Sequence, residues 1–305
     1  MTAPIKDTIQ DDINKYGLEI NKVYNEDCLI GMERIKDKSI DMILCDLPYG
    51  TTQNKWDSII PLNDYIEIEI ETRKKIKKTI FTQDEYKIYC FDNNISNIEF
   101  KKNWEQSSKL GLWSHYNRII KDNGAIVLTS AQPFSTKLIE SNKSIFKYCW
   151  IWEKPNGTGH LNAKKQPLRS YEDICIFYKK QCTYNPQMEK GKPYRWNSTR
   201  GQSSSYREHA ENDEINNKGI RYPKNVLKIK QERGLHPTQK PVELFNYLIK
   251  TYTNENDIVL DNCMGSGTTA ISAIDTNRKF IGFENDKENG YFNMINERIK
   301  TTNND

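Results

Sequence analysis

Residues 257–276 read DIVLDNCMGSGTTAISAIDT and combine an apolar run, a glycine turn and a helical segment. The pattern predicts a buried strand at Asp257–Asp261, a tight turn at residues 262–267 and a helix at Thr268–Thr276. A second strand is predicted at Lys279–Phe283, immediately before Glu284. This order is typical of half of a nucleotide-binding α/β unit, in which glycines let a ligand approach the helix N-terminus and a following acid binds ribose hydroxyls.

The glycine turn by itself leaves the ligand open. Residues 265–270, GSGTTA, fit the loose dinucleotide pattern G-x-G-x-x-A, so a nicotinamide or flavin enzyme is one interpretation. A glycine turn that joins a strand to a helix without any ligand is another. A Walker A phosphate loop is excluded, because Gly267 is followed by Thr268 and not by Lys.

Short, mostly apolar runs typical of buried parallel strands recur along the rest of the chain, with helical segments between them. The strands are expected at Ile40–Cys45, Ala125–Thr129, Phe146–Trp152 and Asp173–Tyr178, and the helices at Leu29–Ile35, Trp113–Ile120, Phe134–Glu140 and Val242–Tyr252. Alternation of strands with helices predicts an α/β fold with a doubly wound, mostly parallel sheet and crossover connections.

The composition argues against a membrane protein and favours an intracellular one. Mean hydropathy is −0.82 over 305 residues, and no apolar run reaches the roughly 18 residues that a bilayer span needs. The polar start, Met1–Lys15, has no signal-peptide apolar region, so we expect an intracellular, cytoplasmic protein with no membrane partner. The seven cysteines include no C-x-x-C pair, which indicates neither a metal site nor a disulfide.

Two segments interrupt the alternation of strands and helices. Residues 63–103 are rich in Glu, Lys, Ile and Asn, and we interpret them as an insertion of unknown role. Residues 179–235 hold 13 Lys or Arg against 6 Asp or Glu, although the whole chain has a formal charge of only +4. Aromatic residues lie among the arginines of this second segment. It therefore predicts a basic surface module.

The tetrapeptide Asp46-Leu47-Pro48-Tyr49 follows the first of these predicted strands, at the edge of the sheet where ligands bind in α/β proteins. The Asp46 carboxylate accepts a hydrogen bond from an amine. Pro48 restricts the backbone carbonyls beside it, and the ring of Tyr49 offers a face on which a planar base can stack. Taken alone, the same residues also fit an Asp in a type I turn with Pro following.

Three motifs occur together in the chain: DLPYG at residues 46–50, HPTQKP at 236–241 and DNCMGSGTT at 261–269. Together they resemble the amino-methylating (N6-adenine or N4-cytosine) DNA methyltransferases, in the circularly permuted beta class whose catalytic tetrapeptide precedes the cofactor glycines. The resemblance implies a single Rossmann-like methyltransferase domain over residues 1–305, with a target-recognition region at 179–235 and a cofactor-binding part at 236–300. It gives no role to residues 63–103.

The resemblance also implies roles for individual residues. The catalytic loop corresponds to Asp46, Leu47, Pro48 and Tyr49. The residues that bind S-adenosylmethionine correspond to Asp27, Cys28, Thr238, Lys240, Asp261, Cys263, Gly265, Ser266, Gly267, Thr268 and Glu284. Among them, Glu284 is expected at the ribose, Asp27 near the adenine, and Thr238 with Lys240 at the methionine carboxylate. Pro241 suits the first position of a helix, which places Lys240 at its positive end.

Two of the motifs depart from the family pattern, and the insertion after Pro61-Leu62 is a third departure. Leu47 replaces the usual Pro of the tetrapeptide, and Asn262-Cys263 replaces the usual Pro-Phe after the acid of the cofactor loop. Leu47 still supplies a backbone carbonyl. Cys263 covers less of a cofactor than Phe does.

The activity that the resemblance implies is sequence-specific methylation of the exocyclic amine of a flipped base in double-stranded DNA. An Asp at the start of the tetrapeptide favours adenine N6, with cytosine N4 as the alternative by the same mechanism. Methylation at cytosine C5 is set aside, because none of the cysteines follows a proline. A dinucleotide-dependent oxidoreductase is a more distant alternative that leaves DLPYG and HPTQKP unexplained.

The basic segment is expected to contact the DNA backbone, with base contacts from a minority of its residues. The expected contacts are Lys192, Arg195, Arg200, Arg207, Arg221 and Lys224. Lys154 and Arg169 lie either near the target strand or on a solvated edge of the sheet. A homodimer is compatible with the sequence, and neither the oligomeric state nor a restriction partner follows from it.

Overall fold

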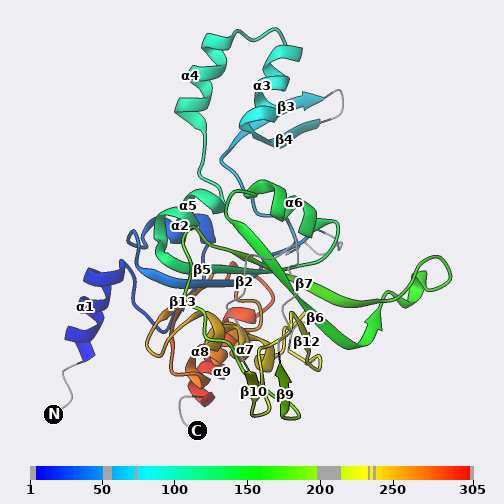
Figure 1. Cartoon of the computed structure of the whole chain (residues 1–305). Helices are drawn as coiled ribbons and strands as arrows, with labels where there is room; N and C mark the ends of the chain where they lie inside the picture. The colour runs from blue at the N-terminus through cyan, green and yellow to red at the C-terminus, as the bar shows by residue number, and fades with distance from the viewer. Residues whose placement is uncertain are drawn as a thin grey trace.

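The computed structural model describes residues 5–50, 57–72, 75–197, 214–232, 234–235 and 238–302 (Figure 1). Within these residues, an eight-stranded sheet forms the centre of the molecule, in the order β1-β14-β13-β2-β5-β7-β6-β12. Its strands are β1 (Lys22–Tyr24), β2 (Ile40–Asp46), β5 (Ile120–Ser130), β6 (Phe146–Thr158), β7 (Arg169–Phe177), β12 (Val226–Lys228), β13 (Ile258–Asp261) and β14 (Lys279–Phe283). The predicted strands all lie in this sheet.

Every neighbouring pair in the sheet is parallel except the two pairs that β7 forms, with β5 and with β6. The prediction that residues 173–178 form a parallel strand is therefore wrong. The physical reason is the connection before it. β6 passes into β7 through the short segment 159–168, and a hairpin of this kind reverses the chain direction, whereas a parallel neighbour needs a crossover.

Helices cover both faces of the sheet (Figure 1). One face carries α2 (Cys28–Glu33), α5 (Leu112–Ile119) and α6 (Phe134–Ser141), and the other carries α7 (Val242–Tyr252), α8 (Thr268–Asp275) and α9 (Tyr291–Thr302). The predicted doubly wound α/β architecture is confirmed. An N-terminal helix, α1 (Ile5–Tyr16), lies at the side of this body. No helix in the described ranges is both long and apolar enough to cross a membrane.

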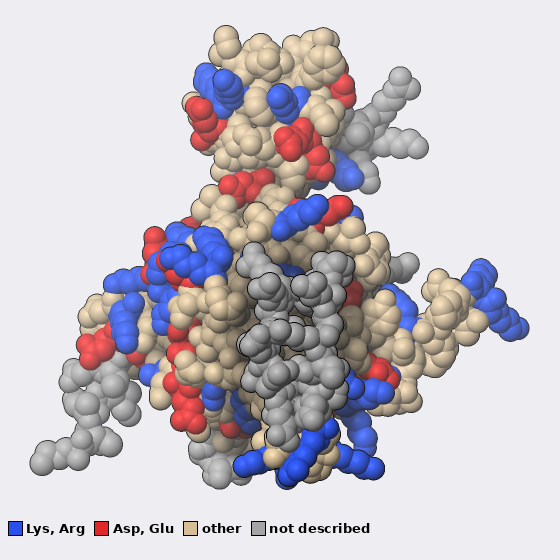
Figure 2. Space-filling model, in the orientation of Figure 1, with Lys and Arg blue, Asp and Glu red and all other residues tan. Residues whose placement is uncertain are grey.

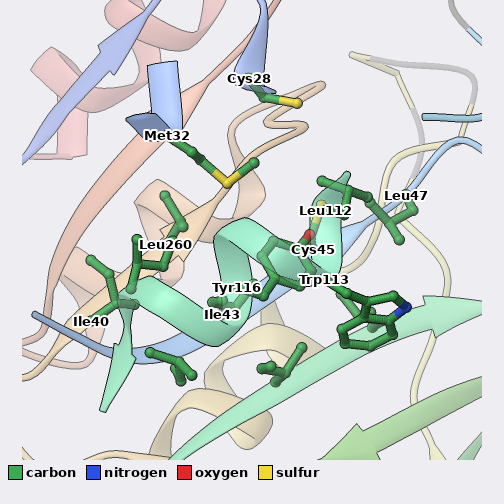
Figure 3. Close-up of a cluster of buried hydrophobic side chains, with 14 of the residues drawn as sticks. Cys28, Met32, Ile40, Ile43, Cys45, Leu47, Leu112, Trp113, Tyr116 and Leu260 are labelled. Atoms are coloured by element: carbon green, nitrogen blue, oxygen red, sulfur yellow. The ribbon is translucent and has the colours of Figure 1, made fainter. Parts of the chain in front are cut away.

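Each face of the sheet has its own hydrophobic core, because side chains alternate between the faces along a strand. In β2, Ile43 and Cys45 pack on the side of α2 and α5, as Figure 3 shows, together with Tyr116. Met42 and Leu44 of the same strand pack on the side of α7 and α8. This burial on both faces holds the end of β2 rigidly, and Asp46 is its last residue.

Residues 63–107 form a separate unit, the outer subdomain, that projects from the body (Figure 1). It consists of the antiparallel hairpin β3 (Tyr65–Thr72) and β4 (Lys75–Thr82) and the helices α3 (Gln83–Asp92) and α4 (Asn97–Ser107). Its small core contains Ile66, Tyr86, Cys90 and Phe100. At its base, Tyr65 and Lys109 exchange both backbone hydrogen bonds, at N···O distances of 2.9 and 2.7 Å.

Two smaller features complete the fold. A short 3-10 helix, η1 (His160–Asn162), lies at the tip of the β6–β7 hairpin. Within the described part of the basic segment, two short antiparallel ribbons form: β9 (Tyr194–Asn197) with β10 (Glu214–Asn217), and β8 (Glu189–Lys190) with β11 (Ile220–Arg221).

Candidate active site

The C-terminal ends of β1, β2, β13 and β14 meet at one edge of the sheet, where a cavity of about 1140 Å³ opens. Almost all the predicted catalytic and cofactor-binding residues line this cavity: Asp27, Cys28, Asp46, Leu47, Pro48, Tyr49, Thr238, Lys240, Asp261, Cys263, Gly265, Ser266, Thr268 and Glu284. Gly267 is the N-cap of α8 and lies within the same turn. Residues from separate parts of the chain thus converge, as expected at this edge of an α/β sheet.

The glycine turn needs glycines because its backbone is left-handed. Gly265 has a φ of 54° and Gly267 a φ of 79°. A Cβ on Gly267 would also lie 2.9 Å from the side chain of Ile295. The Thr268 hydroxyl donates to the backbone oxygen of Lys240 at 3.1 Å, which ties the turn to the segment before α7.

Two carboxylates flank the turn, of which Asp261 is buried and Glu284 is half-buried. Glu284 follows β14 and accepts from the backbone N–H of Gly265 at 2.7 Å, and burial raises the pKa of Glu284 to about 7. Asp261 ends β13 and accepts from the backbone N–H of Cys263 at 2.9 Å, with a second bond from the Thr269 hydroxyl. Burial raises the pKa of Asp261 to about 6. Both groups therefore titrate closer to neutrality than ordinary carboxylates.

Asp27 and Asn262 shape the far side of the cavity. The Asp27 carboxylate is the N-cap of α2 and accepts from the N–H of Leu29 at 2.8 Å. The side chain of Asn262 is buried, and its oxygen accepts from the Tyr116 hydroxyl at 2.5 Å. Its amide nitrogen faces the sulfur of Cys263 at 3.4 Å. Asn262, one of the departures from the family pattern, thus contributes hydrogen bonds that Pro cannot make.

The Asp46 carboxylate is held by three donors. One oxygen, Oδ1, accepts from the hydroxyls of Tyr49, at 2.9 Å, and Thr129. The other, Oδ2, accepts from Lys240 Nζ at 2.5 Å. The Tyr49 ring stacks on Phe134 with 5.4 Å between centroids, and Lys240 Nζ lies 5.6 Å from the Tyr49 centroid. Burial and the Asp46 charge raise the pKa of the Tyr49 hydroxyl well above its usual value, so it stays a donor.

Lys240 belongs to a buried network of alternating charges. Its ammonium lies 3.4 Å from Glu172 Oε2, and Glu172 Oε1 also pairs with Lys154. Burial disfavours the charge of Lys240, but the carboxylates of Asp46 and Glu172 outweigh it and raise the pKa of Lys240. Burial likewise disfavours the charge of Glu172, and the two lysines outweigh it and lower the pKa of Glu172. Lys240 and Glu172 are therefore both charged at neutral pH.

The structure differs from the sequence-based view of Lys240 in one respect. Pro241 is the N-cap of α7 and not its first helical residue. Lys240 still faces an anion in front of that helix, and the anion in this structure is Asp46. A contact between Lys240 and a methionine carboxylate stays a prediction.

The comparisons with known proteins agree with this geometry. A family model described as DNA methylase, of the N6/N4 methyltransferase type, matches residues 40–297. The chain belongs to this family. The DNA methylase is 26% identical to the type II methyltransferase M.HindIII of Haemophilus influenzae, over 92% of this chain and 95% of the relative. It is also 26% identical to M1.MboII of Moraxella bovis, over 92% and 96% of the two chains.

A solved structure with the same fold is the PvuII DNA methyltransferase, described as cytosine-N4-specific. It is 16% identical to this DNA methylase, with a TM-score of 0.53 over 93% of this chain and 91% of that one. The M1.HpyAVI–SAM complex gives a TM-score of 0.50 at 19% identity, over 91% and 98% of the two chains. At these identities, the likeness establishes the fold alone.

Two residues that contact the predicted site residues, Glu172 and Thr129, were not predicted from the sequence. Glu172 lies in the first half of β7, whereas ligand-binding residues were sought after the ends of parallel strands. Because β7 is antiparallel, its first half lies at the edge where β2 and β5 end. The polar segment between β6 and β7, which lacks a helix pattern, was the available signal for this reversal. Thr129 is the last residue of the strand predicted at Ala125–Thr129, where a polar side chain is such a signal.

The predicted DNA-binding residues of the methylase fall into three groups. Lys192, Arg195 and Lys224 are exposed. Arg221 is half-buried, lies over the ring of Tyr194 at 4.5 Å and donates to backbone oxygens of the module, so it holds the module together. Arg200 and Arg207 lie outside the described residues. Figure 2 shows Lys and Arg side chains clustered at the lower end of the molecule, around β9 and β10.

Proposed function

We propose that this DNA methylase transfers a methyl group from S-adenosylmethionine to the exocyclic amino group of a base extruded from duplex DNA, with adenine N6 as the favoured target. One observation carries the proposal: Asp46 and the glycine-turn residues Gly265 and Ser266 line the same cavity, although the chain between them is long. The order of these motifs supports assignment to the circularly permuted class.

The residues around the glycine turn fit the proposed cofactor. The turn faces the cavity with a left-handed backbone at the start of α8, Glu284 supplies a carboxylate for ribose hydroxyls, and Asp27 lies at the adenine end. Lys240 supplies a cation for a carboxylate. When bound, S-adenosylmethionine supplies the methyl group as an electrophile. A nicotinamide enzyme is not favoured, because it leaves Asp46 and its three donors without a role.

The catalytic loop supplies the acceptors that such a target amine needs. The amine lone pair is delocalised into the base ring and attacks only when the nitrogen becomes pyramidal. Asp46 Oδ1 already accepts from two hydroxyls, whereas Oδ2 has a single donor and retains a free acceptor position. We assign Oδ2 to one N–H and the backbone oxygen of Leu47 to the other, which stabilises the positive charge that develops on the nitrogen.

Extruding the base costs about a few kcal/mol, which contacts in the cavity must offset. Stacking on an aromatic ring contributes roughly 1–3 kcal/mol per base, and Tyr49 is the ring that we assign to it. Phe134 stacks on the Tyr49 ring and keeps its orientation fixed. Leu47 is buried in the core under the loop, which anchors the backbone oxygen beside it.

Adenine is favoured because an Asp opens the tetrapeptide, and because a relative that is 25% identical is named DNA adenine methyltransferase YhdJ, from Escherichia coli. Cytosine N4 is the alternative, since the amine geometry is the same. The relatives named type II methyltransferases support action at a specific sequence, with residues 179–235 as the recognition region. The recognition affinity should fall with salt, with a slope of about −0.9 per phosphate neutralised.

The test is to incubate mixed-sequence duplex DNA with the protein and labelled S-adenosylmethionine, digest the DNA to nucleosides and identify the labelled one. We expect N6-methyl-2′-deoxyadenosine, and N4-methyl-2′-deoxycytidine would select the alternative base. Asp46→Ala should lower the rate about a thousandfold, in line with the loss of an electrostatic stabiliser. Asp92→Asn, on the exposed end of α3, is the matched control. Full activity of the Asp46 variant would refute the assigned chemistry.

A further inference from the structure

The outer half of the β6–β7 hairpin, residues 154–171, extends beyond the sheet as an arm (Figure 1). The two strands pair at Glu153 with Tyr171 and again at Thr158 with Arg169, with an irregularity in the register between these two pairs. Every residue from 159 to 171 is exposed, and Leu161 at the tip has an exposed fraction of 101%. The outer part of the arm, residues 159–171, therefore faces solvent rather than the protein core.

The charge of the arm has a single sign. Residues 154–171 contain no Asp or Glu, and they contain Lys164 and Lys165 near the tip and Arg169 at the start of β7. None of these three cations forms an ion pair with a carboxylate in the described part of the chain, whereas Lys154 at the base is buried and paired with Glu172. Figure 2 shows the Lys and Arg side chains gathered at the end of the arm. A cationic surface of this kind attracts a polyanion.

The arm begins at the candidate active site. Lys154, Thr158, Arg169 and Tyr171 line the cavity that contains Asp46. A duplex whose extruded nucleotide reaches Asp46 therefore has its backbone beside the arm. In this position, the cations of the arm would face the phosphates next to the target base.

We propose that the arm is a second DNA-contact surface, separate from residues 179–235, in which Lys164, Lys165 and Arg169 contact phosphates that flank the extruded nucleotide. The inference rests on the proposed function and specifies where the duplex lies on the molecule. Phosphate contacts of this kind position the duplex and carry no sequence information. Their removal weakens binding to every sequence by a similar factor.

The test compares two pairs of adjacent exposed lysines. The double variant Lys164→Ala/Lys165→Ala removes the pair on the arm, and Lys101→Ala/Lys102→Ala removes a pair on α4 of the outer subdomain. Binding to a mixed-sequence duplex is measured by fluorescence anisotropy over a range of salt concentrations. We expect the arm variant to reduce the log–log salt slope by about 0.9 for each phosphate that is no longer neutralised, thus by up to about 2, and the control to leave it unchanged.

The outcomes separate this inference from the proposed function. S-adenosylmethionine binding should be the same for both variants and the unaltered protein, which shows that the cavity is intact. If the unaltered protein methylates DNA and the arm variant keeps its affinity and salt slope, the inference about the arm is wrong and the proposed function stands. If the unaltered protein neither binds nor methylates DNA, both are wrong.

Discussion

The central sheet and the outer subdomain each hold a glutamate between two lysines, in opposite surroundings. Glu172 lies between Lys154 and Lys240, whose side chains are 8% and 6% exposed. Glu67 of the outer subdomain pairs with Lys109 at 3.0 Å and with a second lysine on β4, whose side chains are 55% and 69% exposed. The same residue types thus form a tightly coupled network next to Asp46 and a solvated group on the outer subdomain.

The largest difference is expected when each glutamate is removed. Glu172→Ala removes the carboxylate that pairs with buried Lys154 and leaves Lys240 with Asp46 alone, and we expect it to lower the free energy of unfolding by about 3–5 kcal/mol. Glu67→Ala should cost about 0–1 kcal/mol, because its partners remain solvated. Urea denaturation measures both. Equal costs for the two variants would contradict the comparison.

The two cores can be tested in the same way. Phe245 of α7 belongs to the large core of the central sheet, and Phe245→Ala should lower the free energy of unfolding by about 3–5 kcal/mol. Phe100 of α4 belongs to the small core of the outer subdomain. We expect Phe100→Ala to accelerate amide hydrogen exchange in α3 and α4 and to leave β2 and β5 protected. Faster exchange in β2 with this variant would mean that both units unfold together.

The smallest expected effect is a difference in pH dependence. The pKa of Glu284 is raised from an ordinary 4.5 to about 7 by burial, so the folded protein holds this proton more tightly than the unfolded chain. Its contribution to stability is complete below about pH 4.5 and is lost as the pH rises through about 7. The pKa of Glu67 is lowered, mainly by Lys109, so its contribution is present above its ordinary pKa and is lost as the pH falls.

In the unaltered protein, the free energy of unfolding should fall as the pH rises from about 4.5 to about 7. Glu284→Gln should remove this fall, as measured by urea denaturation at about pH 5 and pH 8. Glu67→Gln is the matched control and should leave that interval unchanged. If the unaltered protein and the Glu284 variant show the same pH profile, the raised pKa of Glu284 is wrong.

The elements of the fold that could be predicted from the sequence are those whose bounds are determined by local patterns. The bounds predicted for α7 and β14 agree with the structure, because apolar periodicity and the flanking turns determine them locally. The direction of β7 is not encoded in its own residues, since a buried strand has the same apolar pattern in either direction. Glu172 was missed for that reason, although it lies in a strand that was predicted.

The outer subdomain illustrates a second limit. The alternation of Ile and Glu in residues 65–72 is a clear strand signal, and β3 forms there. What the sequence does not encode locally is that Tyr65, Glu67 and Ile80 of this hairpin line the same cavity as Asp46. That proximity depends on how the unit is mounted on the body, which no pattern within residues 63–103 specifies.

The way the outer subdomain is mounted has a consequence for changes in its length. The paired backbones of Tyr65 and Lys109 bring the two ends of the unit together, and just below them Leu112 donates to the backbone oxygen of Pro61 at 2.9 Å. The entropy of closing a loop grows only with the logarithm of its length. Because the two ends of the outer subdomain are held together, a change in its length should alter the free energy of unfolding of the body only slightly. A change in the length of this unit is therefore expected to leave Asp46 in its position.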